Sequence, residues 1–523
     1  MFSPRLRISY TEGLPIVSTA TLVGVILLIL SGMIGIMTVK GLAHFWPKTL
    51  YQVTYLADDE EVPKQIFASL LSRDFVTTEG QKRWLFSQAS LFQFSDQQHL
   101  IEQQQIIKME PLEDLTDIQL RNGNRVIARL QGLVEGSRPL PMAALDKLTE
   151  KVEGQVEELQ ALKRGKLAAI HMQLAEYDRR QVSADAPARQ RLVEEFEAVS
   201  QTLAVAELEL SRYRLQLLFD DGRYHELALA EIESLHRLNS LTSWQKGEHF
   251  VQSLWVFVSE KPKRANSAGG VFPALFGTVV MVLMMTLIVT PLGVMAAIYL
   301  NEYAPENGLT SLLRVGVNNL AGVPSIVYGV FGLGFFVYQV GGNIDKLFFS
   351  EHLPAPTFGA PGIFWASLTM AMLTLPVVIV ATEEGLRRVP DSLRQGSYAL
   401  GATQFETVWR TVIPIASPGI MTGVILAIAR GAGEVAPLLL VGAVKFAPSL
   451  PLDTEFPYLH LDRQFMHLGV LIYDGAFHSN NIGHGSSMMF ASCLLLLLVV
   501  LILNIVAVWV RARLRNRYQA LAR

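Results

Sequence analysis

The chain has 523 residues, of which 50% are hydrophobic and only 17% are charged, and its formal net charge is −3. Soluble chains of this size are usually about one quarter charged, so the composition favours a membrane protein. The weak acidic balance gives no basic field, which excludes nucleic acid as an expected partner, and the single cysteine, Cys493, excludes a disulfide within the chain.

The first apolar run, at about 15–39, is long enough to cross a bilayer, because about 20 helical residues span its hydrocarbon core. It is too long for the apolar part of a signal peptide, and the residues after it offer no clear cleavage site. We therefore interpret residues 1–46 as an N-terminal tail and a first transmembrane helix that is retained.

A polar segment follows at 47–268 and is long enough to fold as a domain of its own. The stretches YQVTYL, RVIARLQGLV and LQLLFDDGRYHELAL are typical of strands, and the last contains an Asp-Gly turn. Between these strands lie long helical patterns. The segment therefore predicts a mixed α+β domain.

The helical part of this domain has the spacing of a coiled coil. From Leu192 to Leu217 apolar residues recur at alternating spacings of four and three, and residues 145–162 show a similar pattern. Turn formers and a proline separate the two stretches. We expect an antiparallel coiled-coil hairpin at about 143–218, serving either as a self-contained brace or as a docking surface for another external protein.

Five more apolar runs lie in the C-terminal part of the chain, at 269–523, and each predicts a transmembrane helix. They are centred on about 272–299, 314–340, 362–382, 416–444 and 486–510. With the first run, the sequence predicts an α-helical membrane protein of six spans.

Basic residues set the expected orientation. Arg5 and Arg7 precede the first span and RARLRNR (511–517) follows the last, so both termini are expected in the cytoplasm. The domain at 47–268 then lies outside, in the periplasm. The loop at 383–414, which we call the coupling loop, lies inside.

The sequence shows no catalytic apparatus. It contains no nucleotide-binding P-loop, no paired-histidine zinc motif and no nucleophile elbow, so we expect no catalytic residue, bound metal or cofactor. The histidines of HLDRQFMHL (460–468) are expected in an external loop with a solvated or interfacial role.

The fifth span carries two charges, in the stretch ARGAGEVAPLL. A guanidinium at the centre of a span costs roughly 2.5–3.5 kcal/mol. Counted from residue 416, Arg430 is expected about 21 Å into the span, past its midplane, with Glu434 on the same helix face. The pair either fixes helix packing, or Arg430 presents a cation to an anion that crosses the membrane while Glu434 orients it. The guanidinium fork suits phosphate-like oxyanions.

Two further features lie in loops. The coupling loop predicts two helices broken at Gly401 and ending at Pro414, which form either an ordinary surface pair or a docking element for a soluble partner. In GVPSIVYG, Pro324 and Ser325 mark a possible helix break that lines a pathway, or a plain packing kink.

The coupling loop resembles the coupling motif of ABC-importer permeases. That motif has a Glu-Ala-Ala start, a glycine six residues after the Glu, and a final hydrophobic-Pro pair. The matching positions here, in chain order, are Gln395, Gly396, Ser397, Gly401, Ile413 and Pro414.

Longer blocks, such as GVPSIVYGVFGLGFFV and GVILAIARGAGEVAPLLLVGA, resemble the phosphate-specific PstA family of these permeases. The resemblance implies an enlarged variant with the type I permease fold, in a bacterial inner membrane, that imports inorganic phosphate and assigns Arg430 and Glu434 to transport. It also implies a PstC-like second permease, two PstB-like ATPases that hold the ATP and magnesium, and a PstS-like phosphate-binding protein.

Three alternatives remain open at this stage. The cargo could be another oxyanion, such as sulfate, molybdate or phosphonate. The chain could instead be a membrane-anchored sensor or scaffold that uses its coiled-coil domain, or an ion-coupled secondary transporter.

Overall fold

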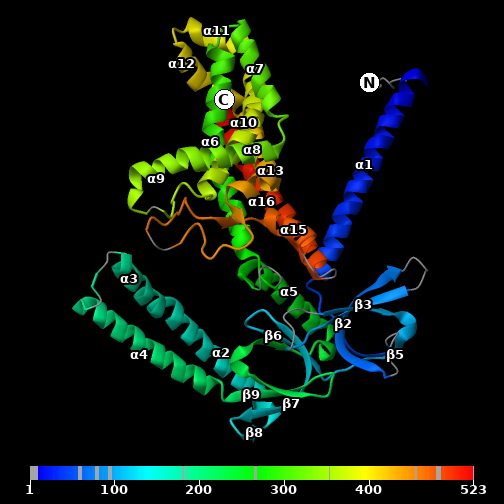
Figure 1. Cartoon of the computed structure of the whole chain (residues 1–523). Helices are drawn as coiled ribbons and strands as arrows, with labels where there is room; N and C mark the ends of the chain where they lie inside the picture. The colour runs from blue at the N-terminus through cyan, green and yellow to red at the C-terminus, as the bar shows by residue number, and fades with distance from the viewer. Residues whose placement is uncertain are drawn as a thin grey trace. The chain divides into compact units, whose positions relative to one another are not determined.

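The computed structural model describes residues 10–56, 62–76, 82–91, 97–179, 182–183, 185–263, 268–352, 354–453, 456–478 and 484–521. The chain divides into two compact units (Figure 1). Met1–Phe45 and Leu254–Arg523 form the first, which we call the membrane unit, and Trp46–Ser253 form the second, which we call the sheet domain. The division falls within helix α5 (Ser243–Ser259).

Six helical segments in the described part of the chain are long and apolar enough to cross a membrane. They are Val17–Ala43, Phe272–Tyr303, Ser325–Phe348, Ile363–Arg387, Gln404–Gly433 and Ser487–Arg513. The predicted number of spans is therefore confirmed.

The third and fifth spans are displaced from the predicted 314–340 and 416–444. The third begins only at Ser325, because Pro324 cannot continue the preceding helix and starts a new one. The fifth begins earlier, at Gln404, because a polar helix runs without a break into the apolar one. It ends at Gly433, where the backbone of Glu434 becomes extended.

The membrane unit is almost entirely helical. Its α-helices are α1 (Tyr10–Ala43), α6 (Phe272–Ile298), α7 (Gly308–Leu320), α8 (Ser325–Phe331), α9 (Gly342–Phe348), α10 (Ile363–Arg387), α11 (Asp391–Ala399), α12 (Gln404–Thr407), α13 (Ile413–Gly433), α14 (Ala436–Val441), α15 (Leu468–Phe477) and α16 (His484–Leu521).

Short π-helical and 3₁₀-helical turns join several of these helices. The π-helical turns are η7 (Tyr299–Tyr303), η8 (Gly332–Gly341) and η10 (Val408–Val412), and a 3₁₀ turn is η9 (Ser350–His352). Two strand pairs complete the unit. Antiparallel β12 (Pro262–Lys263) pairs with β13 (Ala268–Gly269), and parallel β14 (Ala443–Val444) pairs with β15 (Phe465–Met466).

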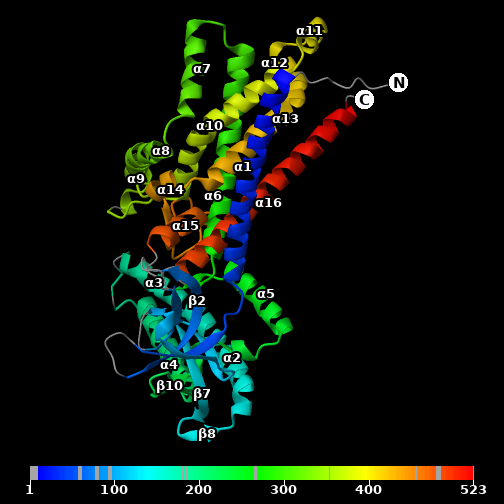
Figure 2. The ribbon, with the colours of Figure 1, turned by 90° about the vertical axis from the view of Figure 1, so that its right-hand side faces the viewer.

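Helix α10 is the centre of the membrane unit, with α6 and α13 packed along it (Figure 2). Small residues permit this close packing: a Cβ built on Gly419 of α13 would lie 2.5 Å from the Cα of Gly385 in α10. Glycines are used in this way in membrane helices because backbones then approach closely. Helix α13 also packs on α16, and α16 packs on α1.

The sheet domain contains two antiparallel sheets. The first has the strand order β4-β3-β2-β1-β5, and the second has the order β10-β9-β7-β6-β11 with β8 paired to β7. The strands are β1 (Leu50–Tyr55), β2 (Lys64–Val76), β3 (Lys82–Gln88), β4 (Gln97–Glu102), β5 (Ile106–Pro111), β6 (Leu115–Leu120), β7 (Arg125–Glu135), β8 (Arg138–Leu140), β9 (Tyr213–Leu218), β10 (Tyr224–Ala228) and β11 (Ile232–His236).

An apolar core joins the two sheets. Leu50 and Phe67 of the first sheet pack with Leu115 and Ile127 of the second, and all four are buried. Alternation along each strand points these residues inward. The predicted α+β class is confirmed, and the three predicted strand stretches form β1, β7 and the β9–β10 hairpin, whose turn contains Gly222 at φ +77°.

A helical hairpin leaves the second sheet. Its first arm is α2 (Leu145–Leu162), the π turn η3 (Lys163–Leu167) and α3 (Ala168–Arg179), and its second arm is α4 (Pro187–Leu210). A shared apolar seam, which includes Ile170, Val199 and Leu203, holds the arms together.

The predicted end of the hairpin at 218 is wrong. Helix α4 ends at Leu210, and Tyr213 and Leu217, which continue the heptad spacing, belong to strand β9. Leu217 pairs with His225 of β10 and Tyr213 pairs with Glu135 of β7, and this strand pairing overrides the helical spacing. The coiled-coil geometry of the two arms stays a prediction.

Candidate functional site

The charged pair of the fifth span lies at a helix end. Arg430 is in the last turn of α13, and Glu434 is the first residue after it, with φ −82° and ψ 131°. The Nε atom of Arg430 lies 3.6 Å from Oε1 of Glu434, and the side chains are 33% and 25% exposed in the isolated chain. The two charged side chains therefore meet at the spacing of four residues that the sequence predicts, although Glu434 lies just past the last residue of the helix.

The end of α13 is fixed by close contacts with other spans. A Cβ on Gly431 would lie 2.5 Å from Sδ of Met285 in α6. After α13 ends at Gly433, the next helix is also held closely: a Cβ on Gly329 of α8 would lie 2.7 Å from Cα of Pro437 in α14. The backbone on both sides of the charged pair is thus held in place, and the pair is presented by a rigid support.

This geometry leaves the guanidinium able to bind an anion. A separation of 3.6 Å is an ion pair but too long for a hydrogen bond. Glu434 therefore offsets part of the charge of Arg430 without taking up its donors in a short bidentate contact. Such an arrangement suits transient binding of an oxyanion.

The possible helix break lies where the sequence places it, but between helices. Pro324 caps α8 and Ser325 is its first residue, after α7 has ended at Leu320. Tyr328 of α8 donates a hydrogen bond to the carbonyl of Leu320 at 2.8 Å, which closes the turn between the two helices. A role of this break in a substrate pathway stays a prediction.

The coupling loop forms the two predicted helices, α11 and α12. Gln395 and Gly396 lie on the exposed face of α11, while the hydroxyl of Ser397 is 2.8 Å from that of Thr407 and links the two helices. Gly401 turns the chain between them at φ +85°, a conformation that strongly favours glycine.

The predicted end of the helix pair at Pro414 is wrong. Ile413 and Pro414 are the first two residues of α13, and the π turn η10 joins them to α12 in one helical path from Gln404 to Gly433. Proline is tolerated in the first turn of a helix. The coupling loop and the helix that carries Arg430 are therefore continuous.

The coupling loop also exposes apolar side chains. Leu400 is 90% exposed, and Phe405 and Trp409 stack with ring centroids 6.3 Å apart while about two thirds of each side chain is exposed. Exposed aromatic residues on a polar loop are typical of a protein interface. The arrangement favours the docking interpretation of this loop.

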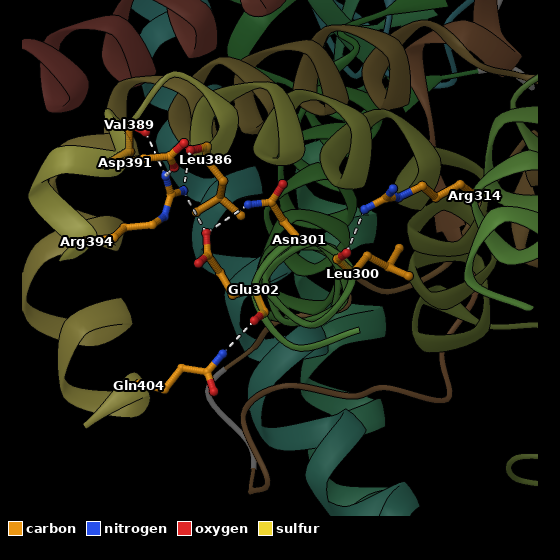
Figure 3. Close-up of polar contacts among 9 residues, drawn as sticks. All are labelled: Leu300, Asn301, Glu302, Arg314, Leu386, Val389, Asp391, Arg394 and Gln404. Atoms are coloured by element: carbon orange, nitrogen blue, oxygen red, sulfur yellow. Dashed lines mark hydrogen bonds and ion pairs between the residues drawn. The ribbon is translucent and has the colours of Figure 1, made fainter. Parts of the chain in front are cut away.

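Sequence reasoning missed a buried ion pair at the root of the coupling loop (Figure 3). Arg394 of α11 donates to Oε1 of Glu302 in η7 at 2.9 Å, and the two side chains are only 13% and 6% exposed. Burial disfavours the charge of Arg394, but the hydrogen bonds and charges of Glu302 and Asp391 together outweigh burial and raise the pKa of Arg394. No sequence motif marks this pair, because Glu302 and Arg394 lie 92 positions apart in the chain.

His467 corrects another expectation. It is not solvated but 1% exposed, and its Nδ1 accepts a hydrogen bond from the backbone N–H of Gly469 at 3.1 Å, which caps α15. Burial lowers the pKa of His467 to about 4, so the ring is neutral. His460 lies 2.9 Å from a carboxylate oxygen of Asp453.

Comparisons with known proteins agree on the membrane unit. Residues 289–517, which include the charged pair and the coupling loop, match the family described as "Binding-protein-dependent transport system inner membrane component". The phosphate transport system permease protein PstA 1 of Mycobacterium tuberculosis (strain CDC 1551 / Oshkosh) is 36% identical over 244 residues, covering 47% of this chain and 71% of the relative.

A second relative gives the same result. The phosphate transport system permease protein PstA of Yersinia pestis is 35% identical over 256 residues, covering 49% of this chain and 77% of the relative. Among solved structures, a chain of the inward-facing MetNI methionine ABC transporter aligns at 16% identity over 51% of this chain and 98% of its own, with a TM-score of 0.34, which is too low to support an inference.

Proposed function

The chain belongs to the PstA family of phosphate transport system permeases, and from this premise we propose that it moves inorganic phosphate into the cytoplasm as one subunit of an ATP-driven importer. It is a multi-pass inner-membrane protein with six candidate spans. The chain itself catalyses no covalent reaction. A partner ATPase hydrolyses the ATP, and this subunit supplies half of the pore.

The observation that carries the proposal is the charged pair at the end of α13. Phosphate near neutral pH is an anion that must lose water to pass through the pore, and Arg430 offsets part of that loss with charge-assisted hydrogen bonds. Glu434, at 3.6 Å, shares the charge of Arg430 and keeps the site weak enough to release the ion. A pathway site needs both properties.

The proposed orientation rests on the basic residues that flank the spans, and the proposed partners rest on the similarity to PstA permeases. Both termini and the coupling loop face the cytoplasm, where the loop's exposed Leu400, Phe405 and Trp409 contact a PstB-like ATPase. The sheet domain faces the periplasm. A PstC-like permease completes the pore, a second ATPase copy serves that permease, and a PstS-like protein delivers phosphate from outside.

The test is phosphate uptake by the assembled importer carrying Arg430→Gln. The substitution keeps a shorter polar side chain but removes the charge. Loss of a charge-assisted hydrogen bond worth about 1.5–3 kcal/mol predicts at least a roughly tenfold fall in the uptake rate. Arg223→Gln is the matched control, because Arg223 is a 73% exposed arginine in the sheet domain. That variant should transport normally.

The amount of protein in the membrane and its co-purification with the ATPase show whether each variant assembles. An Arg430→Gln importer that assembles and still transports at the normal rate would return the pair to a packing role. Uptake of sulfate or molybdate in place of phosphate by the unaltered importer would overturn the choice of cargo.

A further inference from the structure

Arg394 ties the coupling loop to the end of α10. Its Nη1 donates to the carbonyl of Val389 at 2.7 Å, and its Nη2 donates to the carbonyl of Leu386 at 3.0 Å (Figure 3). These carbonyls lie at the C-terminal end of α10, where the helix dipole favours a cation. Asp391 adds a contact of 3.0 Å to Nη1, but its side chain is 85% exposed.

The same guanidinium holds a third element, the end of α6. Glu302, in the π turn that extends α6, accepts from Nη2 of Arg394 and, at 2.8 Å, from the side-chain amide of Asn301. Gln404, the first residue of α12, donates to the backbone carbonyl of Glu302 at 2.6 Å. The end of α6 is therefore gripped from both helices of the coupling loop.

An apolar cluster lies at the same end of these helices. Leu300 of η7 packs with Leu386 in the last turn of α10, with Val389 just after it, and with Val412 of η10 and Ala416 of α13. All five residues are buried. Arg314 of α7 donates to the carbonyl of Leu300 at 2.7 Å and lies 3.6 Å from Glu383 of α10. The ends of three spans and the coupling loop thus form one packed block.

We propose that Arg394 and Glu302 form a latch that makes the end of α6 move together with the coupling loop when the partner ATPase pushes on it. The loop is continuous in sequence with α10 and α13, so these spans follow its movement through the backbone. The α6 span has no such backbone connection, because 86 residues lie between Glu302 and Val389 in the sequence. The latch adds a charged side-chain link to the Gln404 hydrogen bond and the apolar packing of Leu300 at this end of α6.

The buried charges make this connection stiff. Guanidinium and carboxylate groups that are nearly out of water gain little by separating, because each would be left buried and unpaired. Arg394 and Glu302 act as positioning residues, since both side chains are buried and join the ends of neighbouring helices. The inference rests on the proposed function and adds the path by which the motor reaches α6.

The first test is the ratio of phosphate transported to ATP hydrolysed by the reconstituted importer in proteoliposomes. Glu302→Gln keeps an oxygen that accepts hydrogen bonds but removes the charge, and we expect the ratio to fall at least fivefold while ATP hydrolysis continues. Asp391→Asn is the matched control, because it alters the exposed partner of the same guanidinium. Its ratio should stay within twofold of the unaltered importer.

A second measurement can be made in the importer with Glu302 intact, so it does not require the Glu302→Gln variant to fold. Spin labels at Tyr303→Cys in η7 and Tyr398→Cys in α11, both about 40% exposed, report the separation of the two elements in an importer whose Cys493 is replaced by serine. We expect one unchanged distance in nucleotide-free and ATP-bound states. In the Glu302→Gln background the distance should differ between these states.

Two results would overturn the latch: an unchanged transport ratio in an assembled Glu302→Gln importer, or a label distance that changes with ATP when Glu302 is intact. Failure of the proposed function gives a different result, since the unaltered importer would then take up no phosphate at all. If Glu302→Gln prevents assembly, the label distance in the otherwise unaltered importer decides.

Discussion

Arg394 and Arg430 differ in how completely their guanidinium groups are paired. Arg394 is 13% exposed and has four acceptors within 3.0 Å, two of them backbone carbonyls. Arg430 is 33% exposed, and the ion pair that it makes with Glu434 is at 3.6 Å. An arginine whose two terminal nitrogens are both held by close acceptors fixes structure, while one with more donors to spare can bind a ligand. The difference supports a positioning role for Arg394 and a substrate-binding role for Arg430.

Gly401 should be intolerant of any side chain, for a backbone reason alone. A Cβ there would meet nothing within 4 Å, but φ is +85°, where an L-residue is strained by about 1–2 kcal/mol. Gly401→Leu should therefore change the turn between α11 and α12 and lower the yield of ATPase that co-purifies with the subunit.

Gly396→Ala is the matched control for this substitution. Gly396 lies within α11, and a Cβ there would also meet nothing within 4 Å, so alanine should stabilise the helix by up to about 1 kcal/mol. Its co-purification should be unchanged or improved. Equal co-purification by Gly401→Leu and Gly396→Ala would show that the turn does not position the docking surface.

At the scale of elements, π-helical turns mark the joints of the membrane unit. The turn η7 extends α6 to Glu302, and η10 joins α12 to α13. Such turns interrupt the regular ladder of hydrogen bonds and are frequent at functional sites. Both turns contact the coupling loop or belong to it, so the local irregularity lies where movement must pass from the loop into the spans.

The contact between α10 and α13 should depend on Gly419. Alanine at this position would place its Cβ 2.5 Å from the Cα of Gly385, and backbone cannot move aside as a flexible side chain can. Gly419→Ala should lower the unfolding free energy by about 1–3 kcal/mol through overpacking. A lower thermal unfolding midpoint in detergent, followed by tryptophan fluorescence, would show the effect.

Gly32→Ala in α1 provides the comparison, since a Cβ there meets nothing within 4 Å. Its midpoint should match that of the unaltered chain or exceed it slightly. If Gly419→Ala unfolds at the same temperature as Gly32→Ala, the two helices are not held at the close separation that the glycines permit.

The spans were predictable because each is a continuous apolar run, while their ends were not. Pro324 at a helix start and the extended backbone of Glu434 depend on packing that hydropathy does not contain. Strands such as β2 and β6 were missed, because their burial depends on pairing with distant strands. The coupling loop was predicted from its length and helical pattern and then from its resemblance to a family motif, but the Arg394–Glu302 pair required the fold.

At the scale of the whole molecule, the two units are stabilised by different chemistry. The membrane unit packs helices through small residues such as Gly385 and Gly419, with few titratable groups in its apolar cores. The sheet domain buries part of several titratable groups, among them His99, His236 and Asp220. Its stability should therefore depend on pH.

The histidines of the sheet domain set the direction of this response. Burial lowers the pKa of His99, His236 and His249, and the rings of His236 and His249 meet edge to face at 4.7 Å. The unfolded chain takes up protons near pH 6.5, whereas the folded domain does so only at lower pH. The unfolded state thus binds more protons in this range, and stability falls as the pH drops below about 6.5.

We predict that the sheet domain unfolds at a lower urea concentration at pH 5.5 than at pH 7.5, as measured by pulse proteolysis of the full chain in detergent. Asp220 acts in the opposite sense, because burial raises its pKa and the stability it contributes is lost as the pH rises. In the Asp220→Asn variant, the difference between the urea midpoints at pH 7.5 and pH 5.5 should therefore be equal to that of the unaltered chain or larger. Replacing His236 and His249 together with glutamine should reduce it, and equal midpoints at both pH values in the unaltered chain would contradict the assignment.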